Sequence, residues 1–333
     1  MMNKKGKKGV SARSFWVEAP GRGELREEQL TAPQAGQVLV RTRYSGISRG
    51  TESLVFGGRV PSSQHQAMRA PFQVGDFPAP VKYGYASVGE VEQGPTELRG
   101  RTVFCLYPHQ DRYVVPADAV VALPDGLEPE RAVLAANTET ALNVVWDARI
   151  GPGDRVCVIG AGVVGCLIAW LAGQIAGTEV TLVDLQPTRA GIADQLGVDF
   201  AVPDRAPQEQ DVVIHTSASA AGLSTALACA GMEARVVEAS WFGDAAPGVP
   251  LGEDFHARRL KLMSSQVGQL PADRRARWTY RRRLSKALEL LCDSALDCLI
   301  SGESRFEELP ELMPRLAESS GEVLCHRVVY GQD

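Results

Sequence analysis

The sequence predicts an α/β fold of two domains, in which a β-rich domain precedes a Rossmann-type, doubly wound parallel sheet. The first observation is length, because 333 residues are too many for one ordinary compact core. The second is that short apolar segments alternate with helical patterns through the middle of the chain. The third is a glycine-rich hexamer that directly follows one of these apolar segments.

The first part of the chain consists mainly of strands. Alternation of apolar and polar residues predicts half-buried strands at residues 37–43, 86–93, 101–106 and 112–115. The connection over residues 57–80 is rich in Gly and Pro and has weak periodicity, and loops of that length are often functional. A helix is expected over residues 129–148, with Glu128 and Glu130 near its N-terminus, where negative charge is favourable.

The middle of the chain repeats a cycle of strand and helix. Continuous apolar segments predict strands at residues 155–159, 179–183, 211–215 and 234–239. Helical patterns run from the glycine hexamer to about residue 176, and over residues 189–196 and 220–231. Such strands form a parallel sheet that helices cover on both faces, and its crossovers are right-handed.

The last part of the chain begins with a strongly basic helix near Arg274. A helix at residues 309–317 and a strand at residues 323–329 follow, and we expect this strand to return to the first domain. Six arginines fall between Arg274 and Arg283. They form either a surface for an anionic ligand or a solvated helix face, and the acidic residues downstream favour the solvated face.

Composition narrows the classes of function. A net charge of −5 gives no reason to expect nucleic acid, and no apolar run of about 18 residues suggests a membrane span. Residues 1–13 carry lysines without the apolar block of a signal peptide, so we expect a disordered tail. Seven cysteines without a C-x-x-C pair favour reduced thiols in a cytoplasmic protein over disulfides or a zinc lobe.

The glycine-rich hexamer, Gly-Ala-Gly-Val-Val-Gly, matches the dinucleotide motif G-x-G-x-x-G between a strand and a helix. Gly160 permits the tight turn, Gly162 lets a pyrophosphate approach the backbone, and Gly165 lets the helix pack close to the strand. Val163 and Val164 belong to the first helical turn, whose free N–H groups bind phosphate.

Asp184 ends the next predicted strand and can accept hydrogen bonds from the adenosine ribose hydroxyls, which favours NAD(H). Arg189 lies shortly after it and can accommodate a 2′-phosphate, so NADP(H) is the alternative. A Rossmann-like half that has lost its nucleotide is disfavoured, because the three glycines and the acidic residue are all present.

Six short segments carry a family resemblance, namely residues 38–52 (VLVRTRYSGISRGTE), 84–89 (GYASVG), 114–117 (VVPA), 123–126 (LPDG), 139–142 (ETAL) and 153–154 (GD). With the glycine motif, they resemble the medium-chain dehydrogenase/reductase (MDR) superfamily, the zinc alcohol dehydrogenases and their zinc-free relatives. The resemblance covers about residues 14–330. Residues 45–52 look most like the branch that contains bacteriochlorophyllide 2-hydroxyethyl dehydrogenase.

The resemblance implies the domain organisation. Residues 14–147 would form a GroES-like, β-rich catalytic domain, residues 148–284 a Rossmann NAD-binding domain, and residues 285–333 a segment that returns to the catalytic domain. A small-molecule substrate would meet the cofactor in a cleft between the domains. The resemblance also implies a homodimer or homotetramer, with no nucleic-acid or membrane partner.

The chain departs from the zinc enzymes of this superfamily at their ligand positions. They place a Cys where this chain has Ser48, a His-Glu pair where it has Tyr85 and Ala86, and a third ligand near Ala136. Serine is a poor zinc ligand, tyrosine is uncommon and alanine cannot ligate, whereas catalytic zinc needs three N, S or carboxylate ligands. We therefore expect no zinc.

Without zinc, another group must exchange the proton of the alcohol or carbonyl. Tyr85 is the first candidate, because the resemblance places it where a metal ligand faces the nicotinamide, although it could simply fill that space. His109 titrates near neutrality but could be an exposed loop residue. Ser48 could relay a proton, hydrogen-bond the substrate or merely cap a turn. These three are the predicted catalytic residues.

Further residues are predicted around the cofactor. The resemblance implies that Arg49 contacts a cofactor phosphate and that Thr140 lies near the nicotinamide. Ser240 follows a strand and should flank the cofactor at the carboxyl end of the sheet. His215 is expected on the adenine side, with no catalytic role.

The predicted substrate pocket contains Thr51, Glu52, Glu139 and Trp241. Glu52 could equally pair with Arg49. Glu139 could be a buried acid or a surface charge, and Trp241 could stack on substrate or only pack.

We expect an NAD(P)-dependent, zinc-independent oxidoreductase that transfers hydride between nicotinamide and an alcohol or carbonyl of an unidentified small molecule. The alternatives are an NAD(H)-binding sensor or subunit without turnover, an enoyl- or quinone-type reductase, and an enzyme with a relocated metal site. Glu52, Cys105 and His109 would be the ligands of that relocated site. Asp184 disfavours the quinone-type reductases, which usually prefer NADPH.

Overall fold

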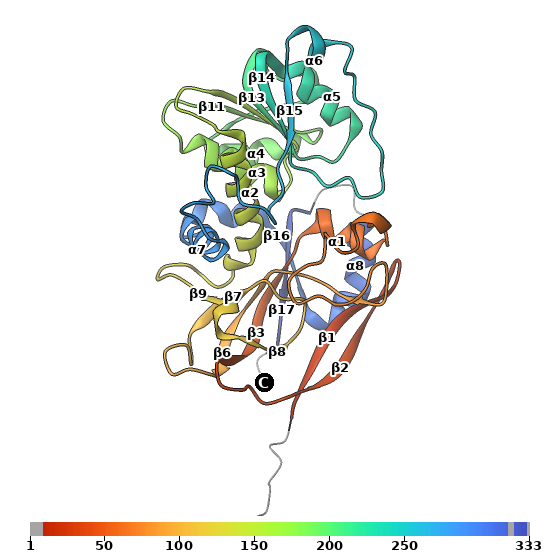
Figure 1. Cartoon of the computed structure of the whole chain (residues 1–333), viewed down its shortest axis with the longest axis vertical. Coiled ribbons are helices and arrows are strands. Elements are labelled where there is room, and N and C mark those ends of the chain that lie inside the picture. Colours follow the sequence, from red (N-terminus) through yellow and green to blue (C-terminus); the bar gives the residue numbers. More distant parts are fainter. Residues whose placement is uncertain (1–8, 319–322, 332–333) are drawn as a thin grey trace, which may run out of the picture. The chain divides into compact units, whose positions relative to one another are not determined.

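The structure is a computed structural model that describes residues 9–318 and 323–331 (Figure 1). Internal contacts divide the chain into two compact units, residues 1–135 with 301–333 (unit 1) and residues 136–300 (unit 2). The units divide after residues 135 and 300, whereas the prediction placed boundaries after residues 147 and 284. Within unit 2, a buried ion pair joins Glu139, which the prediction placed in the catalytic domain, to Arg283, which it placed in the Rossmann domain.

The smaller sheet of unit 1 has the strand order β2-β1-β5-β4. Its main part is the antiparallel hairpin of β1 (Val10–Ala19) and β2 (Arg22–Leu30), and the short strands β5 (Val81–Lys82) and β4 (Val74–Gly75) extend it. The predicted disordered tail over residues 1–13 is wrong for its last part, because Val10 to Arg13 pair with β2. Residues 1–8 of that prediction lie outside the described residues.

The larger sheet of unit 1 has the order β16-β17-β3-β6-β7-β9, and β8 also pairs with β3. Its strands are β3 (Gln37–Ile47), β6 (Ser87–Gln93), β7 (Thr102–Cys105), β8 (Arg112–Pro116), β9 (Val120–Ala122), β16 (Ile300–Arg305) and β17 (Cys325–Val329). The four strands predicted in this region are confirmed as β3, β6, β7 and β8. A valine-rich core that includes Val38, Val40 and Val91 explains the alternating pattern, since these inward residues are fully buried.

Among the residues that the structure describes, two helices and several 3-10 turns complete unit 1. Helix α1 (Arg49–Phe56) follows β3 after one residue, and α8 (Leu309–Glu318) precedes β17. The 3-10 turns are η1 (Ser62–Gln64), η2 (Ala117–Ala119), η3 (Ala132–Leu134) and η7 (Phe306–Glu308). Strand β17 pairs antiparallel with β3, so the end of the chain completes the sheet that its beginning starts.

Unit 2 is built on a six-stranded parallel sheet with the order β12-β11-β10-β13-β14-β15. The strands are β10 (Arg155–Ile159), β11 (Glu179–Val183), β12 (Asp199–Ala201), β13 (Gln210–His215), β14 (Ala230–Glu238) and β15 (Lys261–Ser264). The four predicted strands are confirmed. Strands β12 and β15 lacked a signal because both are short and β15 is exposed throughout.

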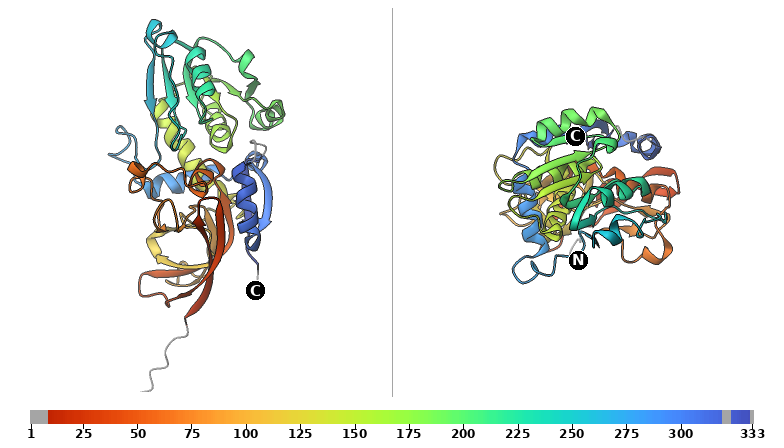
Figure 2. Two further views of the ribbon diagram at one scale, coloured as in Figure 1. Left: turned by 90° about the vertical axis from the view of Figure 1, so that its right-hand side faces the viewer. Right: turned by 90° about the horizontal axis from the view of Figure 1, so that it is seen from above.

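Helices cover both faces of this sheet, as Figure 2 shows from above. Helix α3 (Val163–Gly173) connects β10 to β11, and α4 (Ala190–Leu196) follows β11. Helix α5 (Ala220–Cys229) connects β13 to β14 on the other side of β10. Because the chain winds outward from β10 in both directions, right-handed crossovers place α3 and α5 on opposite faces.

The remaining helical elements of unit 2 are α2 (Ala135–Ala148), η4 (Pro187–Arg189), η5 (Pro203–Arg205), α6 (Asp254–Ala257), α7 (Tyr280–Leu290) and η6 (Ser294–Leu299). The predicted helix over residues 129–148 begins later than expected, first as η3 and then as α2. The basic helix begins at Tyr280 and not near Arg274, because the Thr279 hydroxyl accepts the Arg282 N–H and caps it there. Within the described residues, no helix is long and apolar enough to cross a membrane. All seven cysteines are free thiols.

Candidate active site

The glycine turn of unit 2 has the shape that a dinucleotide pyrophosphate needs. Gly160 has φ +109°, a conformation that L side chains rarely adopt. A Cβ on Gly165 would lie 1.9 Å from the Gly160 carbonyl oxygen, so only glycine lets α3 pack this close. A Cβ on Gly162 would meet nothing within 4 Å, which leaves open space in front of the helix. No side chain caps α3, so the N–H groups of Val163 and Val164 remain available to an anion.

The acidic residue at the end of β11 is held in place by the backbone. Oδ2 of Asp184 accepts the Ala161 N–H at 2.7 Å, and Oδ1 accepts the Gln186 N–H at 2.9 Å. The carboxylate is partly exposed beside the glycine turn, whereas the Arg189 side chain is buried, at 6% exposure. Of Asp184 and Arg189, the acid is therefore the residue that reaches solvent at this strand end.

The strand order places the dinucleotide crevice between β10 and β13, where the direction of winding reverses. The Thr216 hydroxyl donates to the Gly160 carbonyl oxygen at 2.8 Å and joins the two strand ends. His215 ends β13, on the opposite side of β10 from Asp184. His215 is a strand-end histidine, as expected, and its place on the adenine side stays a prediction.

Ser240 and Trp241 follow β14 at the same edge. The Ser240 hydroxyl accepts the Ala218 N–H at 3.0 Å, and its own N–H donates to Glu238 at 2.8 Å. Both Ser240 and Trp241 are partly exposed. Together with the glycine turn and Asp184, this edge fits a nicotinamide dinucleotide.

In unit 1, a chain of buried polar groups joins four residues far apart in sequence. Oε2 of Glu52 lies 2.8 Å from Nε2 of His109, and Nδ1 of His109 lies 2.7 Å from Oγ of Ser45. The Ser45 hydroxyl lies 3.0 Å from the Tyr330 hydroxyl. All four residues are at most 4% exposed. Each link joins groups that can donate and accept, so the four side chains form one continuous hydrogen-bonded chain.

Tyr85 lies beside the Glu52 end of this chain. Its hydroxyl hydrogen-bonds the side chains of Ser48 and Thr51, in the first turn of α1. Burial, and then the charge of Glu52, raise the pKa of Tyr85 well above its ordinary value. Tyr85 is therefore a neutral phenol at physiological pH, able to donate a hydrogen bond or a proton.

Local backbone geometry brings these groups together. Oε1 of Glu52 accepts the Ser48 N–H at 2.8 Å, which ties Glu52 to the start of α1. The Ser48 hydroxyl makes no helix-capping bond, so the capping alternative does not hold. Gly84 has φ +128°, and a Cβ there would lie 3.0 Å from Cδ2 of His109, so glycine lets the segment before Tyr85 pack against the imidazole.

The structure thus brings Ser48, Thr51, Glu52, Tyr85 and His109 into one cluster, and it buries His109 instead of exposing it on a loop. Sequence reasoning missed Ser45 and Tyr330. Ser45 lies inside the segment that carried the family resemblance, but its inward orientation follows only from the pairing of β3 with β17. Tyr330 had no local signal, because its partners are remote in sequence.

Arg49 is the first residue of α1 in unit 1. The predicted site residues Glu139 and Thr140 lie on α2, in unit 2. Glu139 is a buried acid whose Oε1 accepts from Nε of Arg283 at 3.0 Å, and Arg283 also donates to the Val267 carbonyl. The expected solvated face of α7 is therefore wrong for Arg283, which is 2% exposed. The Thr140 hydroxyl donates to the Ala136 carbonyl within α2.

The side chains that could donate to a metal ion do not support a metal site. Among the residues that the structure describes, no group of three His, Cys, Asp or Glu side chains could hold a metal ion. Of the three ligands considered for a relocated site, Glu52 and His109 bond each other. Burial raises the pKa of the Cys105 thiol to about 12, and the thiol hydrogen-bonds Tyr113. The residues present do not fit a zinc site.

Comparisons with known proteins find similar dehydrogenases. D-guloside 3-dehydrogenase of Escherichia coli K12 is 26% identical over 88% of this chain and 92% of its own length. The 2-dehydro-3-deoxy-L-galactonate 5-dehydrogenase of Pseudoalteromonas atlantica is 26% identical over 72% of this chain and 79% of its own. A structure from Sinorhizobium meliloti 1021, described as a zinc-binding dehydrogenase and solved with NADP, has the same fold with a TM-score of 0.76, at 18% identity over 96% of this chain and 99% of that one. No protein-family model matches the chain.

The fold and the dinucleotide edge define an NAD(P)-dependent, alcohol-dehydrogenase-like oxidoreductase, with a GroES-like unit and a Rossmann unit. The chain belongs to the medium-chain dehydrogenase/reductase superfamily.

Proposed function

We propose that this protein is a zinc-independent dehydrogenase that uses NAD(H) in preference to NADP(H) on a secondary hydroxyl or carbonyl of a polyol or sugar derivative. The observation that carries the proposal is the neutral Tyr85 hydroxyl beside the buried Glu52–His109 pair. The substrate class rests on the two dehydrogenases named above, one acting on a guloside and one on a galactonate derivative.

The cofactor, when bound, supplies or accepts the hydride. Gly160, Gly162, Gly165 and Asp184 would hold it. Tyr85 would then exchange the proton. In the direction of reduction its hydroxyl donates a proton to the carbonyl oxygen and becomes a phenolate, and in the direction of oxidation the phenolate takes the proton of the alcohol. Ser48 and Thr51 hold the Tyr85 hydroxyl in place, so that this hydroxyl would polarise the substrate oxygen, as a zinc ion does in the zinc enzymes.

Glu52, His109, Ser45 and Tyr330 support this proton exchange. A proton leaving Tyr85 generates a phenolate close to the carboxylate of Glu52, which is unfavourable in a buried site. The Tyr85 phenolate must therefore regain a proton rapidly. Histidine is suited to pass it on, since one ring nitrogen faces Glu52 and the other faces Ser45.

Zinc independence rests on residue chemistry. Ser48, Tyr85 and Ala86 stand at the positions of zinc ligands, and the Ser48 and Tyr85 hydroxyls bond each other. Neutral hydroxyls in this arrangement are poor ligands for zinc, which prefers thiolate, imidazole and carboxylate.

Preference for NAD(H) rests on Asp184. Its carboxylate would accept hydrogen bonds from the ribose hydroxyls and repel a 2′-phosphate. Buried Arg189 is poorly exposed to such a phosphate.

The test is an assay of chelator-treated, metal-analysed protein with NAD and a panel of polyols and sugar derivatives. We expect turnover that chelation leaves unchanged and that added zinc does not raise. Activity that disappears on chelation and returns with stoichiometric zinc would refute zinc independence. Absence of turnover together with tight NADH binding would favour a sensor.

A further inference from the structure

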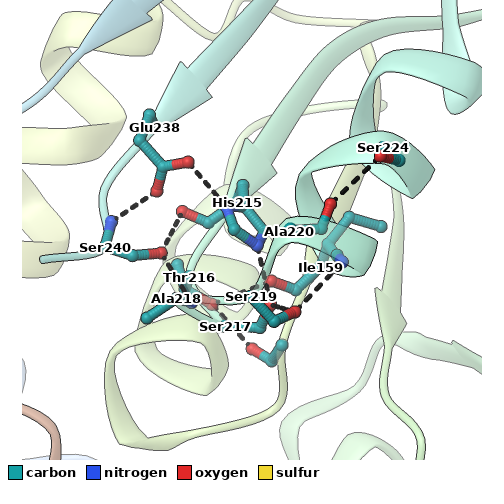
Figure 3. Close-up of polar contacts among 12 residues, drawn as sticks. Ile159, His215, Thr216, Ser217, Ala218, Ser219, Ala220, Ser224, Glu238 and Ser240 are labelled. Carbon is teal, nitrogen blue, oxygen red and sulfur yellow. Dashed lines mark hydrogen bonds and ion pairs between the residues drawn. The ribbon is translucent and has the colours of Figure 1, made fainter. Parts of the chain in front are cut away.

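Three side chains at the carboxyl ends of β13 and β14 have the order of hydrogen bonds of a serine hydrolase (Figure 3). Oε2 of Glu238 lies 2.6 Å from Nδ1 of His215. Nε2 of His215 lies 2.6 Å from Oγ of Ser217. An acid, a base that uses both ring nitrogens and a hydroxyl nucleophile are thus in mutual contact, all within unit 2.

The neighbouring bonds allow one consistent arrangement of protons. The Ser219 hydroxyl accepts the Gly222 N–H at 3.0 Å, so its own hydrogen points to Oγ of Ser217, 2.9 Å away. Ser217 then donates to Nε2 of His215. The Glu238 carboxylate also accepts the Ser240 N–H, so it takes the Nδ1 hydrogen of His215. In this arrangement Nε2 is the free base that a serine nucleophile requires.

The three side chains differ in exposure in the way that a nucleophilic site requires. His215 is fully buried and Glu238 is 17% exposed, which holds the base in one orientation. Ser217 is exposed, so its hydroxyl can meet a ligand. Ala218, the next residue, has φ +51°, a strained conformation that fixes the turn after the serine.

The start of α5 supplies donors beside the serine. Ser219 caps this helix, and Ala220 and Ala221 in its first turn are exposed. The N–H groups of a first turn lack partners inside the helix, so they can stabilise an oxyanion. A Cβ on Gly222 would lie 2.2 Å from Oγ of Ser217 and 2.7 Å from Nε2 of His215, so glycine is required for helix and serine to approach.

We propose that Ser217, His215 and Glu238 form a second reactive site, which accepts an acyl group from small, uncharged carboxylic esters. Oγ of Ser217 attacks the ester carbonyl carbon, and Nε2 of His215 takes the serine proton. The ester C–O bond breaks, His215 gives that proton to the leaving alcohol, and the acyl group remains on Ser217. His215 then takes a proton from water, whose oxygen attacks the acyl carbon. The bond between the acyl carbon and Oγ of Ser217 breaks, His215 returns the proton to Ser217, and a carboxylic acid leaves.

The test uses the full chain without any dinucleotide, so its outcome is independent of the proposed dehydrogenase activity. The protein is treated with a fluorophosphonate probe and, separately, with p-nitrophenyl acetate, and the modified peptide is identified by mass spectrometry. We expect modification of Ser217 and none in Ser217→Ala. His215→Gln should slow labelling about 10²-fold, the usual contribution of a general base.

Matched variants separate the triad from general serine reactivity. Ser224 lies in α5 and its hydroxyl donates to the Ala220 carbonyl, so Ser224→Ala should label like the original protein. Glu238→Gln should slow labelling while leaving the circular dichroism spectrum unchanged. Labelling of Ser217→Ala at the original rate, labelling of another residue only, or no labelling of the original protein would each overturn the proposal.

Discussion

Nε2 of His109 lies 2.8 Å from Oε2 of Glu52, and both side chains are almost completely buried. The second carboxylate oxygen of Glu52 accepts the Ser48 N–H, so Glu52 is held from two sides. Its charge is one cause of the raised pKa of Tyr85, after burial. The pair therefore connects the buried polar chain of unit 1 to the hydroxyl that we propose as proton donor.

Tyr85→Phe should remove the proton donor without disturbing the cofactor edge in unit 2. We expect kcat to fall about 10²- to 10⁴-fold, the usual contribution of general acid catalysis, with NADH affinity unchanged. Steady-state kinetics and NADH fluorescence titration measure both quantities. Tyr83→Phe is the matched control, since the Tyr83 ring lies edge-on to Tyr85 at 5.9 Å. Equal activity of the Tyr85 variant and the original protein would exclude the role.

Glu52→Gln should change the pH dependence of carbonyl reduction. The charge of Glu52 raises the pKa of Tyr85, so its removal lowers that pKa. Because reduction needs the protonated phenol, its loss at alkaline pH should begin at a lower pH in the variant. Profiles of kcat against pH give the comparison, and Glu130→Gln, whose carboxylate bonds Tyr44, serves as control. A shift toward higher pH would contradict the proposed acid.

Asp184→Ser should weaken NADH binding and improve NADPH binding. The substitution removes both an acceptor for the ribose hydroxyls and the charge that repels a 2′-phosphate. We expect the ratio of the two dissociation constants to change at least about tenfold, equivalent to about 1.4 kcal/mol. Asp184→Asn keeps the size and loses the charge, and so separates the two effects. An unchanged ratio in both variants would mean that other residues select the cofactor.

Arg283→Met should destabilise unit 2, because it leaves the buried carboxylate of Glu139 without its partner. Removal of one member of a buried ion pair commonly costs about 3–5 kcal/mol. Burial already raises the pKa of Glu139, which shows how unfavourable its charge is there. The double variant Glu139→Gln, Arg283→Met should recover much of this loss in urea unfolding. Purely additive losses would show that the two side chains do not interact energetically.

Much of the fold could be predicted from the sequence, because its signals are local. The glycine hexamer, the apolar strands of unit 2 and Asp184 each depend on residues close together in the chain, and the structure confirms the strands where they were expected. The N-terminal hairpin was missed, since β2 is largely polar and is stabilised by pairing with β1. The start of α7 was misplaced because the cap at Thr279 decides it.

The amino-acid sequence by itself determined the class of fold, the dinucleotide motif and the absence of the usual zinc ligands, since each depends on residue identity at short spacing. Only the tertiary structure decided which polar groups meet. Ser45 and Tyr330 come together because β17 pairs with β3, and His215 meets Glu238 because β13 and β14 lie side by side. Contacts between distant segments depend on strand order and register, and neither is encoded in a local pattern.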